Sequence, residues 1–278
     1  MKILAVESSG LTASAAVIED DLLKTEFTVS NKLTHSETLL PMIRQMLDIS
    51  GIDKHSLDAI AISAGPGSFT GLRIGAATAK GLALALNIPI ICVSALEAMG
   101  CGLSVLSDGV ICPVMDARRG QVYSAAFRGG ACVIEEGARD IREFLGGLRG
   151  LGDAEDTEFV FLGDGVPVNS DIIAGELDRD VVFAGAEYNR QRAASVGTVA
   201  EVIYKKWLVD NSLTAEHVRT EGADSITCFN DRVMNSDSFA PKYLRKTQAE
   251  RELAAGLLED PGLHSLKKLR AENGNGSE

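Results

Sequence analysis

The sequence is poor in the residue types that build metal, disulfide and nucleic-acid sites. Its 278 residues include four His, and no two of these are close in sequence. The five Cys form no CxxC pair and are odd in number, which is typical of small buried side chains in a reducing compartment. The formal net charge of −12 argues against tight, direct binding to nucleic acid, because that binding depends on Lys and Arg contacts with phosphates.

Long hydrophobic runs are also missing. The apolar start, Ile3–Val6, is too short for the hydrophobic region of a signal peptide. The longest uncharged stretch, Gly81–Leu96, is interrupted by Asn87 and Pro89 and is too short for a membrane span. At about 100–200 residues per domain, the length suggests two domains. We therefore expect a cytoplasmic protein of two globular domains.

The most informative stretch is Gly65–Gly75, with the sequence GPGSFTGLRIG. It joins an expected buried strand over residues 57–64 to a nearly all-apolar helix over residues 72–86. A Walker A loop would need Gly-Lys-Ser/Thr at its end, and the dinucleotide fingerprint would need a shorter spacing between its last two glycines. The motif has neither feature. It predicts instead a tight turn, capped by Ser68 or Thr70, that leads into a closely packed helix.

Small residues line two faces of this helix at steps of four. They are Gly75, Ala79 and Ala83 on one face and Ala77, Gly81 and Ala85 on the other. Such faces let neighbouring helices approach closely. Only Arg73 and Lys80 carry charge. The pattern favours a central helix of its own domain, and the alternative is a helix that also meets a partner protein.

The order of the expected elements repeats along the chain. Each unit has a meander of three strands and then alternating helices and strands. In the first unit these are expected over 2–6, 14–18, 23–29, 36–50, 57–64, 72–86, 90–93 and 95–104. In the second they are expected over 110–115, 121–127, 131–135, 141–148, 158–162, 168–177, 181–184 and 195–209. The repeat predicts a duplicated α/β architecture.

Domain bounds follow from the repeat. We expect a first domain over residues 1–107 and a second over 108–245. Within the second, the polar and weakly periodic residues 211–239 predict a long loop or insertion. A C-terminal extension over 246–278 is expected to begin with a helix over 248–258 and to end in disorder.

Several separated stretches carry one resemblance. They are Thr34-His35-Ser36-Glu37 with Leu39-Leu40-Pro41, the Gly65–Gly75 motif, Lys80–Val93, Asp116-Ala117-Arg118-Arg119-Gly120 and Tyr243-Leu244-Arg245-Lys246. In these stretches the sequence resembles the TsaB (YeaZ) family, and the glycine-rich motif is the most specific of them. The resemblance implies an α/β fold with duplicated actin/hexokinase/sugar-kinase-like (ribonuclease H-like) domains.

The resemblance also implies a role inside a protein complex. TsaB proteins are scaffold or dimerization subunits without catalytic activity. They support TsaD, which carries the metal and transfers threonylcarbamoyl to an adenosine next to the tRNA anticodon. For this chain it implies a heterodimer with TsaD, the ATPase TsaE bound to that pair, and a homodimer when the chain is alone. It implies contact with tRNA mainly through the complex, no membrane, and no cofactor of its own, with ATP and a metal in the partner subunits.

In this family the first two helices of each subunit join TsaB to TsaD, so we expect them and the glycine-rich turn to bind the partner. The first helix offers Leu39, Met42, Ile43 and Met46. The turn and the second helix add Gly65, Gly67, Ser68, Thr70, Gly71, Arg73, Gly75, Ala79 and Lys80. The residues expected near the junction of the subunits, where a nucleotide is an alternative neighbour, are Glu7, Asp116, Arg118 and Arg119. Glu7 stands where relatives commonly have Asp, and its longer side chain places the carboxylate differently.

No catalytic residue and no metal site is predicted. TsaD proteins hold their metal with a His-x-x-x-His on the helix after the glycine-rich motif, but the matching positions here are Ala95 and Met99. Ser68 has no Gly-x-Ser-x-Gly elbow and no His placed by sequence to activate it. Gly163–Gly165 is interpreted as a strand-to-helix turn, with a phosphate-binding turn as the alternative. The alternative functions are an active ATP-dependent kinase or carbamoyltransferase of the same superfold or, less favoured, a peptidase.

Overall fold

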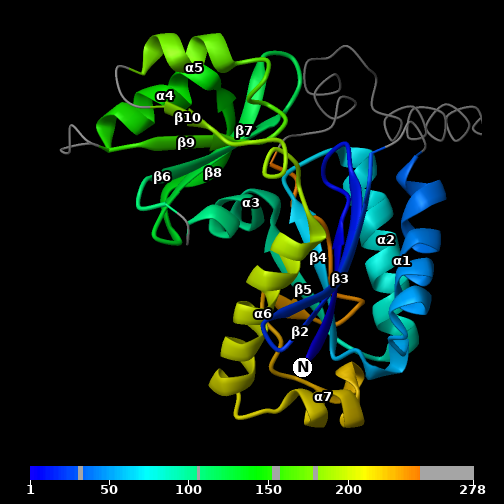
Figure 1. The fold of residues 1–278 in the computed structure, drawn as a ribbon. Coiled ribbons are helices and arrows are strands. Elements are labelled where there is room, and N and C mark those ends of the chain that lie inside the picture. The colour runs from blue at the N-terminus through cyan, green and yellow to red at the C-terminus, as the bar shows by residue number, and fades with distance from the viewer. Residues whose placement is uncertain (31–33, 105–106, 152–156, 178–180, 245–278) are drawn as a thin grey trace, which may run out of the picture. The chain divides into compact units, whose positions relative to one another are not determined.

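The computed structural model describes residues 1–30, 34–104, 107–151, 157–177 and 181–244 (Figure 1). Residues 1–243 form one compact unit. The C-terminal extension expected over 246–278, with its helix over 248–258, lies outside the described residues.

Two sheets with the same strand order organise this unit. The first contains β1 (Lys2–Glu7), β2 (Ala13–Glu19), β3 (Leu22–Val29), β4 (Ala59–Gly65), β5 (Ile90–Ser94) and β11 (Val233–Met234). The second contains β6 (Val110–Asp116), β7 (Gln121–Arg128), β8 (Ala131–Asp140), β9 (Phe159–Leu162) and β10 (Val181–Phe183). Their orders are β11-β5-β4-β1-β2-β3 and β10-β9-β6-β7-β8.

The pairing within the two sheets is also the same. In each, the first three strands form an antiparallel meander, and the next two pair in parallel beside the first strand. The duplicated α/β architecture predicted from the sequence is therefore confirmed. Within the described residues, the first sheet has one strand more than the second, because β11 pairs antiparallel with β5.

Helices cover both faces of the first sheet. On one face lie α1 (His35–Ser50) and α2 (Phe69–Leu86), which run side by side in Figure 1, and on the other lies α6 (Ala193–Asp210). Successive side chains of a strand point to opposite faces. Leu4 and Val6 of β1 accordingly pack into the α1 and α2 side, whereas Ile3 and Ala5 pack against α6.

The remaining helices are short. They are the α-helices α3 (Ala95–Leu103), α4 (Ile141–Gly150), α5 (Ser170–Glu176) and α7 (Ala215–Glu221), with 3-10 turns at Lys54–Ser56 and Ala223–Ser225. Phe144 and Leu145 of α4 and Ile173 of α5 belong to the core of the second sheet.

After the second sheet the chain returns to the first. Val196 and Trp207 of α6 and Val218 of α7 belong to the core formed on the first sheet. Of the long loop or insertion expected over 211–239, the uninterrupted loop is wrong, since this stretch contains α7 and β11. Its weak periodicity has a physical reason: the stretch adds one short helix and a two-residue strand, and both are too short to show a period.

Candidate functional site

The glycine-rich motif, Gly65–Gly75, lies directly against the turn between β1 and β2. Ser68 is the N-cap of α2, and its side chain accepts a hydrogen bond from the Gly71 backbone N–H at 3.3 Å. The Ser68 N–H donates to the Ser9 carbonyl at 2.7 Å, and the Ser8 hydroxyl donates to the Gly71 carbonyl at 3.0 Å. Of the two caps considered from the sequence, Ser68 is the one observed.

Three glycines of the motif are required by this close approach. A Cβ atom at Gly67, Gly71 or Gly75 would lie 2.3, 2.1 or 2.2 Å from an oxygen atom of Ser8 or Ser9. A larger residue at any of these positions would force the glycine-rich segment away from the β1–β2 turn. Gly71 and Gly75 are buried, so their role lies in the packing of the chain itself.

Gly65 and Lys80 hold the segment that follows β11. A Cβ atom at Gly65, which has φ +119°, would lie 2.4 Å from the Lys242 carbonyl oxygen. The Lys242 N–H donates to the Ala64 carbonyl at 2.7 Å. The Lys80 ammonium donates to the Phe239 carbonyl at 3.0 Å. Both residues therefore make internal contacts that the sequence did not indicate.

Arg73 and Thr70 are exposed on the first turns of α2. The Arg73 guanidinium lies 4.0 Å from the centre of the Phe69 ring, a cation–π arrangement. The Phe69 ring packs in turn on Tyr243, with 5.0 Å between the ring centres. Arg73 and Thr70 thus remain accessible to a partner.

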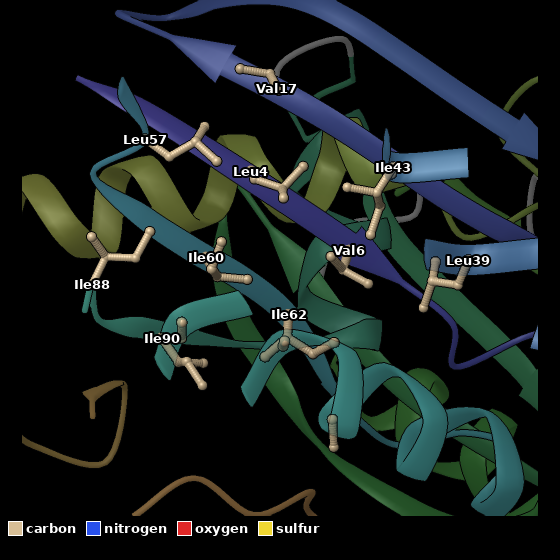
Figure 2. Close-up of a cluster of buried hydrophobic side chains, with 14 of the residues drawn as sticks. Leu4, Val6, Val17, Leu39, Ile43, Leu57, Ile60, Ile62, Ile88 and Ile90 are labelled. Atoms are coloured by element: carbon tan, nitrogen blue, oxygen red, sulfur yellow. The ribbon is translucent and has the colours of Figure 1, made fainter. Parts of the chain in front are cut away.

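The apolar residues predicted for docking on α1 belong to the core of the chain. Leu39, Met42, Ile43 and Met46 are 0%, 6%, 1% and 0% exposed, and Ala79 of α2 is fully buried with them. Figure 2 shows Leu39 and Ile43 pointing into this cluster beside Val6. The predicted docking set requires correction here. An apolar helix face looks the same in sequence whether it packs on its own sheet or on a partner.

The opposite sides of α1 and α2 form an exposed face with an apolar groove. Leu40 and Leu84 are 53% and 63% exposed. The small residues Ala77, Gly81 and Ala85 lie exposed along α2. The groove has a volume of about 920 Å³, and its apolar lining includes Leu40, Pro41, Leu47, Leu82 and Leu86. We call Leu40, Ala77, Gly81, Leu84 and Ala85 the docking stripe. The signal for it in the sequence was the second row of small residues on α2.

Glu7, predicted near a subunit junction, ends β1 and is 1% exposed. Its carboxyl oxygen Oε1 accepts a hydrogen bond from the Ser9 N–H at 2.5 Å. Burial raises the pKa of this carboxyl, and the nearby Ser9 hydroxyl, the Ser9 N–H, the nearby Ser63 hydroxyl and the charge of His35 only partly oppose that rise. The second oxygen, Oε2, has no hydrogen-bond partner within the described ranges of the chain.

Asp116 ends β6, the strand that takes the place of β1 in the second sheet. Arg118 and Arg119 form the β6–β7 turn with φ +65° and +57°. The Asp116 carboxylate accepts the Arg118 N–H at 2.7 Å and lies 3.3 Å from its guanidinium. The Asp116 N–H donates to Asp164 at 3.1 Å, and burial raises the pKa of the Asp164 carboxyl. This arrangement places an ion pair and a second exposed Arg at one turn.

The positions that match the metal ligands of TsaD proteins are apolar and covered. Ala95 and Met99 are buried on α3. In the part of the chain that the structure describes, no group of three or more His, Cys, Asp or Glu side chains is arranged to hold a metal ion. None of the described helices combines the length and the apolar character needed to cross a membrane.

Comparisons with known proteins give the family. The model of the TsaD family, tRNA N6-adenosine threonylcarbamoyltransferase, matches residues 29–253. The Bacillus subtilis tRNA threonylcarbamoyladenosine biosynthesis protein TsaB is 32% identical over 190 residues, which cover 68% of this chain and 82% of that protein. This chain belongs to the TsaB family. The TsaB of Escherichia coli is 36% identical over 129 residues, 46% of this chain and 55% of that protein.

A solved structure shows the same fold. A Pseudomonas aeruginosa protein with similarity to the peptidase YEAZ superposes with a TM-score of 0.67 at 22% identity, over 88% of this chain and 99% of that one. At this identity the likeness concerns the fold and not the activity. The family and the strand order together establish the duplicated actin/hexokinase/sugar-kinase-like architecture that the resemblance implied.

Proposed function

We propose that this TsaB-family chain is a subunit without catalytic activity that docks on TsaD through α1 and α2. Its relatives are named for tRNA threonylcarbamoyladenosine biosynthesis, and the matching family model is that of the threonylcarbamoyltransferase. The observation that carries the docking proposal is the exposed stripe of Leu40, Ala77, Gly81, Leu84 and Ala85.

The stripe has features of a helix-packing surface that no described part of the chain covers. Gly81 lies inside a helix, where Gly is less stable than Ala by roughly 0.8–1 kcal/mol. A Cβ atom at Gly81 would meet nothing within 4 Å, so packing inside the chain does not require Gly there. A second helix pair that packs closely on α2 would require it. Leu40 and Leu84 would bury apolar surface in the same contact.

The assembly that follows is a heterodimer with TsaD, with TsaE bound to the pair. In the absence of TsaD the same stripe would pair with a second copy. The chain would meet tRNA mainly through the complex and would take no cofactor of its own, with ATP and the metal held by the partner subunits. It would work in the cytoplasm.

The test is capture of the chain by TsaD from the same organism. Gly81→Leu fills the stripe at a position with open space, so we expect normal circular dichroism and loss of capture. Val202→Glu is the matched control, because Val202 is 65% exposed on α6, across the first sheet. Normal capture of Gly81→Leu would contradict the proposed docking surface.

Substitutions at the buried positions are poor tests of docking. Ala79→Glu would place a charge in the core, and Gly75→Leu would push α2 away from the β1–β2 turn. Both would unfold the chain before they reported on a partner. The alternatives, an active kinase, carbamoyltransferase or peptidase, would require turnover by the isolated chain, and Ser68→Ala would test the last of them.

A further inference from the structure

A cluster of buried polar groups around the end of β1 has no role in the docking surface itself. Glu7, Ser9 and Ser63 are each 1% exposed. Among the residues that the structure describes, Glu7 Oε2, Ser9 Oγ and Ser63 Oγ have no hydrogen-bond partner. Unpaired polar groups at such depth are costly, so a native fold keeps them only where they acquire partners.

The Glu7 carboxyl is buried without a positively charged side chain of the described residues in contact with it. Glu7 forms no ion pair in the described part of the chain. The one charged group whose field acts on it is His35, at the start of α1 and only half-buried. A buried carboxylate without a cation in contact is unfavourable, and protonation removes the charge.

A neutral carboxylic acid removes the uncompensated charge and gives a hydrogen bond to Oε2 and to one of the two hydroxyls. Its Oε1 accepts the Ser9 N–H, as observed. Its Oε2 would then carry a proton and could donate it to the hydroxyl oxygen of Ser9 or of Ser63, for neither of which the described residues provide a partner. Ser63 belongs to β4, so a bond to Ser63 would tie the end of β1 to the next strand of the sheet.

The turn that Glu7 fixes touches the start of both docking helices. Ser9 and Ser8 hold the first turn of α2 through the Ser68 N–H and the Gly71 carbonyl. The Nε2 atom of His35, the first residue of α1, lies 3.1 Å from the Gly10 carbonyl oxygen. A shift of the turn would therefore move the starts of α1 and α2 together.

We propose that Glu7, as a neutral carboxylic acid, is the positioning residue that fixes the β1–β2 turn and thereby the relative placement of α1 and α2. The inference rests on the docking function proposed above. Glu7 touches no partner in this scheme. It acts only by holding the helices in the geometry that a partner recognises.

The experiment uses the full chain as wild type, Glu7→Gln, Glu7→Asp and Glu7→Ala. Gln is neutral, reaches as far as Glu, and both donates and accepts; Asp keeps the carboxyl but is shorter. Ser124→Ala is the control, since Ser124 is a buried, unpartnered hydroxyl in the second sheet. Amide hydrogen exchange over residues 35–40 and 68–74 is measured in the isolated chain, and affinity for TsaD by calorimetry.

Glu7→Ala should raise exchange in both segments and weaken TsaD binding by roughly tenfold, the effect of one lost buried hydrogen bond. Glu7→Gln and Ser124→Ala should stay within about twofold of wild type on both measurements, a change that corresponds to a few tenths of a kcal/mol. If Glu7→Ala does not fold, Glu7→Gln is compared with Glu7→Asp instead. The proposal requires the hydrogen exchange and the TsaD affinity of Glu7→Gln to be closer to those of wild type.

Two results would overturn the inference. Equal losses in Glu7→Gln and Glu7→Ala would mean that a charged carboxylate is needed. Unchanged exchange in Glu7→Ala would mean that the turn does not depend on it. If wild type itself failed to bind TsaD, the proposed function would fall, and hydrogen exchange alone would still decide whether Glu7 positions the helices.

Discussion

Gly75 of α2 and Ser8 of the β1–β2 turn lie so close that a Cβ atom at position 75 would fall 2.2 Å from the Ser8 hydroxyl oxygen. The contact sets how near the docking helix comes to the sheet. On the same helix, Gly81 faces open space. Close packing therefore requires a glycine at position 75, whereas the described residues leave room for a side chain at position 81.

The first prediction compares Ala at these two glycines. Gly75→Ala should lower the free energy of unfolding by about 1–3 kcal/mol, because overpacking must displace Ser8 or α2. Gly81→Ala should raise it by about 0.5–1 kcal/mol through helix propensity. Urea denaturation of the two variants measures both signs. Equal effects would show that the packing around Gly75 is looser than described.

The second prediction concerns the pH dependence of stability at Glu7. Burial raises its pKa above the ordinary value of 4.5. The folded state therefore holds this proton more tightly than the unfolded chain, which stabilises the fold at low pH. That contribution is complete below pH 4.5 and is lost as the pH rises through the folded-state pKa. The stability of wild type relative to Glu7→Gln should fall over this window, as measured by urea denaturation at a series of pH values. A difference that rises with pH would indicate a charged carboxylate instead.

The third prediction concerns the order in which cysteines react. Cys112 is fully buried, and burial raises the pKa of its thiol well above the usual range. Burial also raises the pKa of Cys92 to about 12 and that of Cys101 to about 11. Partial burial and the neighbouring Glu135 also raise the pKa of the Cys132 thiol, but Cys132 is exposed. Since reaction needs both access and the thiolate, iodoacetamide at pH 8 should label Cys132 before Cys92 and Cys101, and Cys112 only after unfolding. Mass spectrometry of labelled peptides gives the order, and early labelling of Cys112 would contradict it.

The fourth prediction uses the single tryptophan of the sequence. Trp207 of α6 stacks between Tyr204 and Phe229, with ring centres 5.6 and 5.8 Å apart, and its indole N–H donates to the Cys228 carbonyl at 3.1 Å. Phe229→Ala should shift the tryptophan emission to longer wavelength and cost about 1–3 kcal/mol, less than a fully buried Phe because Phe229 is only partly covered. An unchanged emission spectrum would place the 226–229 segment away from α6.

The fold was largely predictable from the sequence, and the reason is periodicity. The strand meanders and the amphipathic helix α1 were predicted from the spacing of apolar residues along the chain, which can be seen in the sequence itself. The helix predicted over 72–86 begins earlier, at Phe69, because the cap is Ser68. The stretch over 211–239 was missed because β11 exists only through its pairing with β5. A two-residue strand has no signature of its own.

The candidate site was less predictable. In the structure α1 and α2 lie beside each other, and the apolar residues of α1 predicted for docking lie on its buried face. Leu39 and Leu40 are neighbours in sequence and equally apolar, yet one is in the core and the other lines the open groove. Likewise nothing in the sequence linked Lys80 with Phe239, which meet across 159 positions of the chain.

By itself the sequence determined the class of structure, the duplication and the glycine motif, since these follow from local patterns and from residues that tolerate tight turns. The tertiary structure alone decided which side of each helix is free and which buried carboxyl lacks a cation. Those properties depend on contacts between distant segments, because burial arises only when the whole chain has packed. Which face of a helix is buried therefore depends on the packing of the whole chain and cannot be predicted from the sequence of that helix.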